Sequence, residues 1–247
     1  MSDNNGLSEL HLSAISGNTE LCKDLLYNSA DPNIRSGELI KNGPLMRDWY
    51  WDPGATPLIL ALEKGQINCA RLLVKLGADA SLHGNYDWGA LHSAVASKSS
   101  GIIELLYQHG ADLDLSSTLR SFDEELSWYF VGTPLHLSAL INDCLSAIEL
   151  IELGASINAA WIDNRTPLFY AAARGSTEVV EVLHNYGADL NAREDTNQHG
   201  YKGNYTPLHY AASNGHRQTY EKLVELGASE TCRECHAGKT PKEMAEW

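Results

Sequence analysis

An internal repeat constrains the fold of this chain more than any other feature of its sequence. The block Thr-Pro-Leu occurs four times, and two degenerate copies, which keep the leucine, begin at Ser8 and Gly89. Counted from the block leucine, a second leucine recurs fifteen residues later and an alanine twenty residues later in all six copies. A glycine precedes that alanine in five copies and Ser29 does so in the first, which suits a left-handed helix C-cap. The block leucines are Leu10, Leu58, Leu91, Leu135, Leu168 and Leu208.

Each copy predicts two short helices. Thr-Pro is typical of an N-cap followed by proline at the first helical position, where its missing N–H costs nothing. In most copies a glycine seven places after the leucine separates the two helices. The second helix carries apolar residues at helical spacing, such as Val179, Val180 and Leu183. A single copy is too small to bury this face, so the copies must stack on one another.

Two helices, a Gly-Ala-Asp-x-Asn turn and a period near 33 residues resemble the ankyrin repeat family, from roughly residue 7 to the end of the chain. The resemblance implies an all-α fold, an ankyrin-repeat solenoid of stacked helix-turn-helix pairs joined by β-hairpin loops. We expect a single ankyrin-repeat domain over residues 1–247, ending in a polar half-repeat that serves as a C-terminal cap. Because the first copy is polar too, we expect a complete protein. The expected repeats are about 7–34, 55–82, 88–115, 132–159, 165–192 and 205–231, with the cap at 238–247.

The repeats are unequally spaced, and the surplus length falls between helix pairs. Successive block leucines are 48, 33, 44, 33 and 40 residues apart, whereas the distance from leucine to alanine stays at 20. The resemblance places this surplus in the hairpins, near residues 35–54, 116–132 and 193–204. Within the second insertion, residues 121–130 carry apolar side chains at helical spacing and predict a short amphipathic helix.

Four histidines follow the block leucine and invite a metal-binding or catalytic interpretation. The resemblance implies instead that each one hydrogen-bonds to the backbone of a neighbouring hairpin. Copies spaced one helix-packing distance apart, about 10 Å, are also too far from one another to share a metal ion. His216 receives the same structural interpretation. The four are His11, His92, His136 and His209.

Five cysteines without a secretion signal favour free thiols over a disulfide framework. Cys22, Cys69 and Cys144 fall on the second-helix face, where we expect them to be buried and inert. Residues 232–236 match Cys-x-x-Cys-His, the signature of haem attachment and half of a zinc site. The chain has neither an export signal nor a second Cys-x-x-Cys, so we expect an ordinary turn there and no cofactor or metal.

Three asparagines, Asn33, Asn158 and Asn191, stand in the hairpin turns. The resemblance implies that they stabilise the turns. It also implies that an asparaginyl hydroxylase modifies them where the cell supplies one.

Charge and motifs exclude several classes of function. With 18 Lys and Arg against 32 Asp and Glu, the net charge of −14 argues against binding to nucleic acid or to an anionic membrane surface. No apolar run is long enough to span a bilayer, and the first residues lack the pattern of a signal peptide, so we expect a cytoplasmic protein. Phosphate-loop, dinucleotide, zincin and nucleophile-elbow motifs are missing from the sequence. We therefore expect no catalysis.

The aromatic residues indicate where a partner binds. Five of the six tryptophans lie between helix pairs, interleaved with acidic residues, in segments that line the concave side of an ankyrin stack. Trp and Tyr dominate interface energies, each contributing about 2 kcal/mol or more at a hot spot. The alternative is that the insertions fold back and bury their own aromatics. The candidate partner-binding residues are Trp49, Tyr50, Trp51, Asp52, Tyr86, Asp87, Trp88, Asp123, Glu124, Trp128, Tyr129, Trp161, Asp163 and Tyr201.

These observations predict a non-enzymatic protein, a monomer when free, that binds a basic protein partner in an acidic, Trp-rich groove. The most specific hypothesis is an inhibitor or an immunity-type protein that neutralises its partner. The alternative is an adaptor or secreted effector of a pathogen or virus, delivered to a host cell and binding a host protein. An enzyme is the third class, and a ligand that co-purifies with the chain would reveal it.

Overall fold

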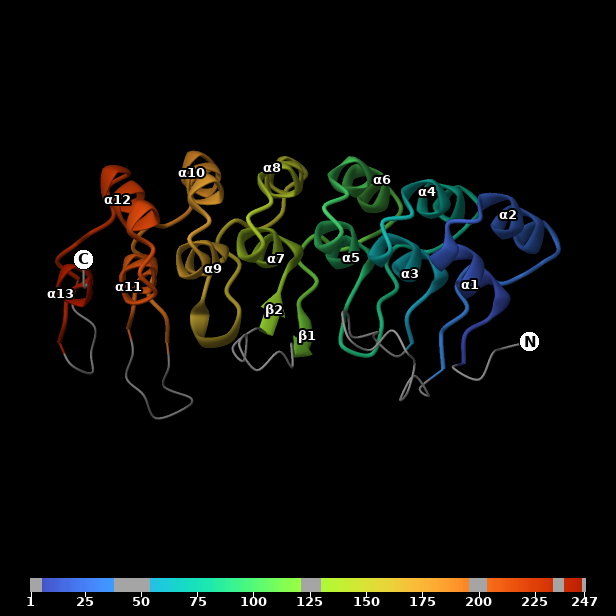
Figure 1. Ribbon diagram of the computed structural model, residues 1–247, viewed down its shortest axis with the longest axis horizontal. Helices are drawn as coiled ribbons and strands as arrows, with labels where there is room; N and C mark the ends of the chain where they lie inside the picture. Colours follow the sequence, from blue (N-terminus) through green and yellow to red (C-terminus); the bar gives the residue numbers. More distant parts are fainter. Residues whose placement is uncertain (1–5, 38–53, 121–129, 196–203, 233–237, 246–247) are drawn as a thin grey trace. The chain divides into compact units, whose positions relative to one another are not determined.

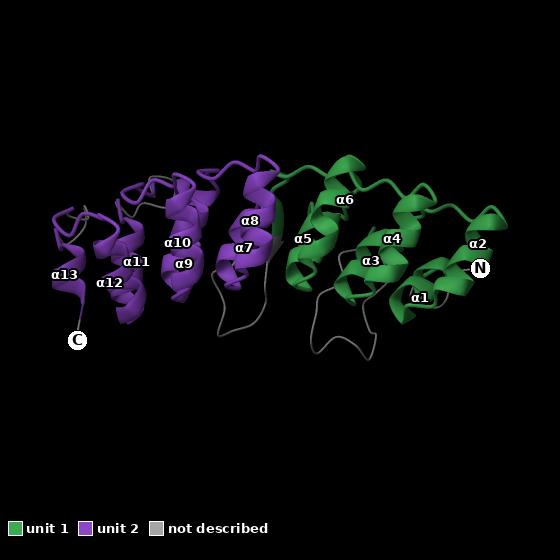
Figure 2. Ribbon diagram, turned by 90° about the horizontal axis from the view of Figure 1, so that it is seen from above, with its two compact units in different colours: residues 1–131 green, residues 132–247 purple. Residues whose placement is uncertain are grey.

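The computed structural model describes residues 6–37, 54–120, 130–195, 204–232 and 238–245. The chain divides into two compact units, Met1–Val131 and Gly132–Trp247 (Figure 2). Each unit consists of helix pairs of the expected kind. That all 247 residues form one domain with the repeat limits given above stays a prediction.

The first unit contains three helix pairs. They are α1 (Glu9–Ser16) with α2 (Thr19–Tyr27), α3 (Pro57–Glu63) with α4 (Ile67–Lys75), and α5 (Ala90–Ala96) with α6 (Ile103–Gln108). A 3-10 turn, η1 (Ser100–Ile102), leads into α6. Helix α3 contacts both α1 and α5, and α2 packs on α4, so first and second helices form two layers (Figure 1). Two short strands, β1 (Ser117–Arg120) and β2 (Phe130–Gly132), pair where this unit ends.

The second unit repeats the same arrangement. Its pairs are α7 (Pro134–Leu140) with α8 (Cys144–Glu152), α9 (Pro167–Arg174) with α10 (Thr177–Asn185), and α11 (Pro207–Ser213) with α12 (Arg217–Glu225). A 3-10 turn, η3 (Ile162–Asn164), precedes α9, and the short helix α13 (Pro241–Met244) packs on α11. In both units the connecting segments project from the first-helix layer, on the side away from the second helices (Figure 1).

The helix ends follow the predicted signals. Thr56 and Thr133 are N-caps whose hydroxyl oxygens accept a hydrogen bond from the backbone N–H three residues later, and a proline follows each. All five predicted C-cap glycines adopt positive φ. Ser29 takes the same left-handed conformation, with φ of 69°, which confirms that the position requires it whatever the residue.

The repeated leucines occupy the core together with other apolar residues such as Ile102 and Phe169. All six block leucines are buried, as are the second-helix leucines from Leu73 to Leu223. The first copy differs, because Leu25 is half-buried and Cys22 is the buried residue of α2 among those described. Helices of seven to nine residues are unstable in isolation, so burial between neighbouring pairs is what stabilises them. None of the described helices combines the length and the apolar character that a membrane span needs.

Candidate partner-binding site

Five of the fourteen candidate residues lie in the described part of the chain. Tyr86, Asp87 and Trp88 belong to a hairpin of the first unit, and Trp161 and Asp163 to a hairpin of the second. The amphipathic helix expected within residues 121–130 lies in a segment of which the structure describes no side chain. The candidates outside the described residues are Trp49, Tyr50, Trp51, Asp52, Asp123, Glu124, Trp128, Tyr129 and Tyr201.

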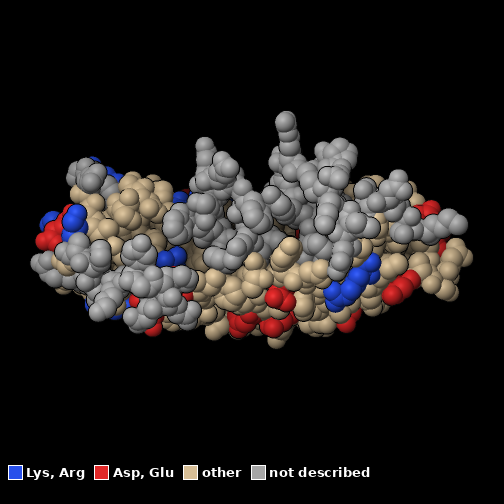
Figure 3. All heavy atoms as spheres, turned by 90° about the horizontal axis from the view of Figure 1, so that it is seen from below, with Lys and Arg blue, Asp and Glu red and all other residues tan. Residues whose placement is uncertain are grey.

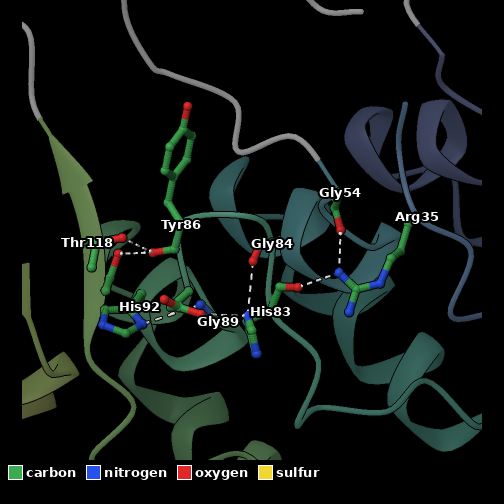
Figure 4. Close-up of polar contacts among 10 residues, drawn as sticks. Arg35, Gly54, His83, Gly84, Tyr86, Gly89, His92 and Thr118 are labelled. Atoms are coloured by element: carbon green, nitrogen blue, oxygen red, sulfur yellow. Dashed lines mark hydrogen bonds and ion pairs between the residues drawn. The ribbon is translucent and has the colours of Figure 1, made fainter. Parts of the chain in front are cut away.

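The first-unit hairpin is a tight turn closed by an antiparallel bridge between His83 and Gly89. The N–H of Gly84 donates to the carbonyl of Trp88 at 3.1 Å, and Asp87 adopts a left-handed conformation with φ of 58°. Arg35, from the preceding repeat, donates through Nη1 to the carbonyl of His83 at 2.8 Å (Figure 4). The hairpin is thus anchored to the preceding connecting segment by a hydrogen bond from the Arg35 side chain to its backbone.

Tyr86 stands at the tip of this hairpin, with a fixed backbone and an exposed side chain. Its carbonyl accepts hydrogen bonds from the N–H of Thr118 and from the hydroxyl of Ser117, both at 3.0 Å. The side chain is 46% exposed, and Figure 4 shows its ring pointing away from these contacts. A rigid backbone presenting an exposed aromatic ring is the geometry of a contact residue, because little conformational entropy is lost on binding.

Asp87 and His83 lie beside Tyr86 on the same hairpin. His83 Nδ1 is 3.2 Å from Asp87 Oδ1 and 3.0 Å from the carbonyl of Gly84, and both side chains of the ion pair are about two-fifths exposed. Since both neighbours of Nδ1 accept hydrogen bonds, Nδ1 carries the proton. The Asp87 carboxylate lies at the surface, and its Oδ1 accepts the hydrogen bond from His83.

The structure differs from the sequence analysis at Trp88, which was expected at the partner-binding surface. Its side chain is only 6% exposed, Nε1 donates to Ser93 Oγ at 2.8 Å, and the indole stacks on His92 with ring centroids 5.1 Å apart. These contacts satisfy the polar atom and bury the ring, so Trp88 stabilises the repeat.

The second-unit hairpin is more polar and partly buried. Trp161 pairs with Arg165 in an antiparallel bridge, and Asp163 and Asn164 both take positive φ. Trp161 is half-buried, and its Nε1 is enclosed without a hydrogen-bond partner. Asp163 Oδ2 is 3.7 Å from Arg165 Nη2, so this candidate is neutralised within the chain.

A charged cluster beside this hairpin was missed by sequence reasoning. Arg165 Nε donates to Glu194 Oε2 at 3.0 Å, and Tyr210 donates its hydroxyl to the same oxygen at 2.7 Å. The guanidinium lies over the Tyr210 ring, 5.2 Å from its centroid, and the Glu194 side chain is 1% exposed. Burial, chiefly, raises the pKa of Tyr210 above its ordinary value, so the phenol stays protonated and acts as a donor. The one signal in the sequence was the arginine directly before Thr166-Pro167.

The turn residues form a regular series of contacts between repeats. The carboxylates of Asp31, Asp79, Asp112 and Asp189 each accept from the N–H two residues later at 2.9 Å. Asn33, Asn158 and Asn191 accept from the backbone N–H at the start of the next turn, at 2.8–3.1 Å. This confirms the turn-stabilising role of the asparagines.

Three of the four block histidines are confirmed as links between repeats. The Nδ1 atoms of His11, His136 and His209 lie 2.8–2.9 Å from the hydroxyl of the N-cap residue. Their Nε2 atoms lie 3.1–3.4 Å from the carbonyls of Ala55, Arg165 and Lys239, each one residue before the next N-cap. Nδ1 accepts and Nε2 donates, so each ring is the Nε2–H tautomer and links two repeats.

The cysteines are partly as expected. Cys22 and Cys69 are buried, Cys144 is half-buried, and Cys232 is a half-buried free thiol. Cys235 and His236 lie outside the described residues, which contain no group of three or more potential metal ligands. The interpretation of residues 232–236 as an ordinary turn therefore stays a prediction.

The described surface on the hairpin side carries acidic residues in separate clusters rather than in one continuous patch (Figure 3). Asp31, Asp79, Asp112 and Asp189 are all exposed. The Ser81 hydroxyl and backbone N–H donate to Asp79 and lower the pKa of its carboxyl group. The turn at Asp79 is thus negatively charged at neutral pH, whereas Asp163 and Glu194 are paired with Arg165.

Helix pairs, hairpin turns and linked histidines define an ankyrin-repeat protein, and comparison with known families agrees. A family model described as ankyrin repeats, in three copies, matches residues 10–117 and 125–234. The chain belongs to the ankyrin repeat family. This fold is typically a non-enzymatic scaffold for protein–protein interaction.

Individual relatives are similar over part of their length. The chain is 31% identical over 76% of its residues to the nuclear factor NF-kappa-B p105 subunit of Gallus gallus, covering 21% of that protein. It is 35% identical over 56% of its residues to human ankyrin repeat and SOCS box protein 16, covering 28% of it. It thus spans about a fifth to a quarter of these relatives. Among solved structures, the ankyrin repeat domain of Bcl-3, an IkappaB protein, superimposes with a TM-score of 0.73 and 25% identity, over 99% of this chain and 96% of that one.

Proposed function

We propose that this chain binds a basic protein partner through the hairpin side of its repeats and has no catalytic activity. The observation that carries the proposal is Tyr86, an exposed aromatic ring on a hairpin whose backbone is held by Ser117, Thr118 and Arg35. Asp87 is the next residue of the same hairpin, and exposed turn aspartates lie in neighbouring repeats. An aromatic anchor flanked by carboxylates suits lysine and arginine side chains.

The candidates outside the described residues extend the proposal. Trp49, Trp51 and Trp128 come from the two insertions of the first unit and have acidic neighbours in sequence, so they suit the same chemistry. Trp88 is left out of the proposed site because it is buried, and Asp163 because Arg165 neutralises it.

The form of the activity that we favour is inhibition or immunity-type neutralisation. Its support is the acidic balance of the whole chain and the similarity to Bcl-3, an IkappaB protein. An adaptor or pathogen effector would use the same surface on a host protein. The identity of the captured partner separates these two, since a neutralising protein binds a partner from its own cell.

The test is a matched pair of tyrosine substitutions. Tyr86 on the hairpin and Tyr107 on α6 are 46% and 43% exposed and belong to the same unit. With the partner identified by affinity capture, we expect Tyr86→Ala to weaken its binding by about 2 kcal/mol, roughly thirtyfold, as titration calorimetry would measure. Tyr107→Ala should leave the affinity unchanged. Equal effects of the two substitutions, or no effect of Tyr86→Ala, would contradict the proposal.

A further inference from the structure

We infer that a hydroperoxide oxidises the thiols of Cys22 and Cys69 to a disulfide. This disulfide links the first two helix pairs of the chain. The two Sγ atoms are 3.2 Å apart, one on α2 and the other on α4. Both side chains are at most 1% exposed. This site is distinct from the partner-binding hairpins and does not rest on the proposed function.

The surroundings favour a thiolate at this pair. The Cys69 thiol lies 3.2 Å from Cys22 Sγ and 3.9 Å from the carbonyl of Ser13, so it can donate to Cys22 once Cys22 is a thiolate; this hydrogen bond lowers the pKa of Cys22 and raises that of Cys69. Ser13 Oγ lies 3.1 Å from Cys22 Sγ and 2.9 Å from the carbonyl of Leu10. While Cys22 is a thiol, the Ser13 hydroxyl donates its proton to the Leu10 carbonyl. When the thiolate forms, the hydroxyl can rotate and donate to the Cys22 sulfur. A thiolate is the reactive form in oxidation.

The chemistry needs two electrons and two protons from the pair. The Cys22 thiolate attacks one oxygen of hydrogen peroxide, the O–O bond breaks and a sulfenic acid forms, while the departing hydroxide takes up the proton that Cys22 had released and leaves as water. The Cys69 sulfur then attacks Cys22 Sγ, the S–O bond breaks, and a second water leaves. Two thiols are oxidised to one disulfide and one peroxide is reduced to two waters.

The local packing allows a small oxidant to reach the pair and the two sulfur atoms to approach each other. Sulfur atoms in a disulfide are about 2.05 Å apart, so α2 and α4 must approach by roughly 1 Å at this point. Helix α2 is held weakly for its length, since Cys22 is its one buried residue among those described. Transient opening of α2 admits a small oxidant, because segments with few buried contacts open at low free-energy cost.

Oxidation of the whole folded chain tests the inference. The protein is treated with hydrogen peroxide, remaining thiols are alkylated, and disulfide-linked peptides are identified by mass spectrometry. We expect a peptide joining Cys22 to Cys69 to appear at least tenfold faster than in guanidinium, where α2 and α4 are no longer held together. Dithiothreitol should reverse it, and the amides of α2 should exchange hydrogen more slowly in the oxidised form.

Cys144 is the internal control. It is half-buried on α8, and burial and neighbouring carboxylates raise its pKa, so it should still be alkylated when Cys22 and Cys69 are already linked. Cys144→Ser should leave the linkage rate unchanged, whereas Cys22→Ser should leave Cys69 alkylatable. If Cys22 and Cys69 stay reduced in the folded wild-type chain while Cys144 is oxidised, or if linkage is no faster than in guanidinium, the inference is wrong.

Discussion

At the scale of single residues, the same side chain makes different hydrogen bonds in neighbouring copies of the repeat. Thr133 and Thr166 are both buried N-caps. The hydroxyl of Thr133 lies 2.8 Å from His136 Nδ1, whereas that of Thr166 has no partner because Phe169 occupies the histidine position. An enclosed hydroxyl without a hydrogen bond contributes nothing to stability.

Substitution of each threonine by valine, which keeps its shape, should therefore separate the two positions. Thr133→Val removes the hydrogen bonds to His136 and should lower the free energy of unfolding by about 1–2 kcal/mol. Thr166→Val removes an unsatisfied group, so the change should stay within about 0.5 kcal/mol or be stabilising. Urea titration followed by circular dichroism measures both. Equal losses would show that the hydroxyl of Thr166 has a partner after all.

Much at this scale follows from the sequence, because it depends on local spacing. The left-handed C-caps, including Ser29, are set by residues a few positions apart, whereas the role of the block histidines, which bond to the next repeat, followed from the resemblance to ankyrin repeats. The burial of Trp88 is different, since it depends on the stacking of its ring on His92 and on the hydrogen bond to Ser93. For a tryptophan between two helix pairs, the sequence alone does not distinguish a buried side chain from an exposed one.

At the scale of elements, the hairpins are joined by contacts that a repeat pattern does not encode. Arg165 and Glu194 are 29 residues apart and come from successive connecting segments. Likewise, the spacing placed Cys22 and Cys69 on buried helix faces, but their contact depends on how α2 sits against α4. Such pairs require the packed structure, because no periodicity relates the two partners.

Glu194→Gln tests whether the buried pair holds the second-unit hairpin. The substitution removes the buried anion of Arg165 and leaves Asp163, at 3.7 Å, as its one ion-pair partner among the described residues, which should cost about 2 kcal/mol of stability. The matched control is Glu221→Gln, which breaks the pair with Arg217 at 2.8 Å between side chains that are both at least 60% exposed. Surface pairs contribute little, so the control should unfold at nearly the wild-type denaturant concentration. Similar midpoints for the two variants would refute a structural role for the Arg165–Glu194 pair.

At the scale of the whole molecule, charge is the property most relevant to function. The chain has 32 acidic and 18 basic residues. Some acids are paired internally, such as Glu194 with Arg165 and Glu181 with Lys222. Within the described residues, the exposed turn aspartates Asp31, Asp79, Asp112 and Asp189 form no ion pair with a basic side chain. Under the proposed function, these carboxylates steer a basic partner, and their effect is screened within about 8–10 Å at physiological ionic strength.

The most direct test of partner binding on the hairpin side is affinity capture from native cell lysate at low and high salt. Wild type is compared with Trp49→Ala/Trp51→Ala/Trp128→Ala, and circular dichroism verifies that the variant is folded. We predict one stoichiometric basic protein on the wild type at low salt, less of it at high salt, and none on the triple variant. A partner that binds the folded triple variant as well as the wild type, with no dependence on salt, would contradict the account.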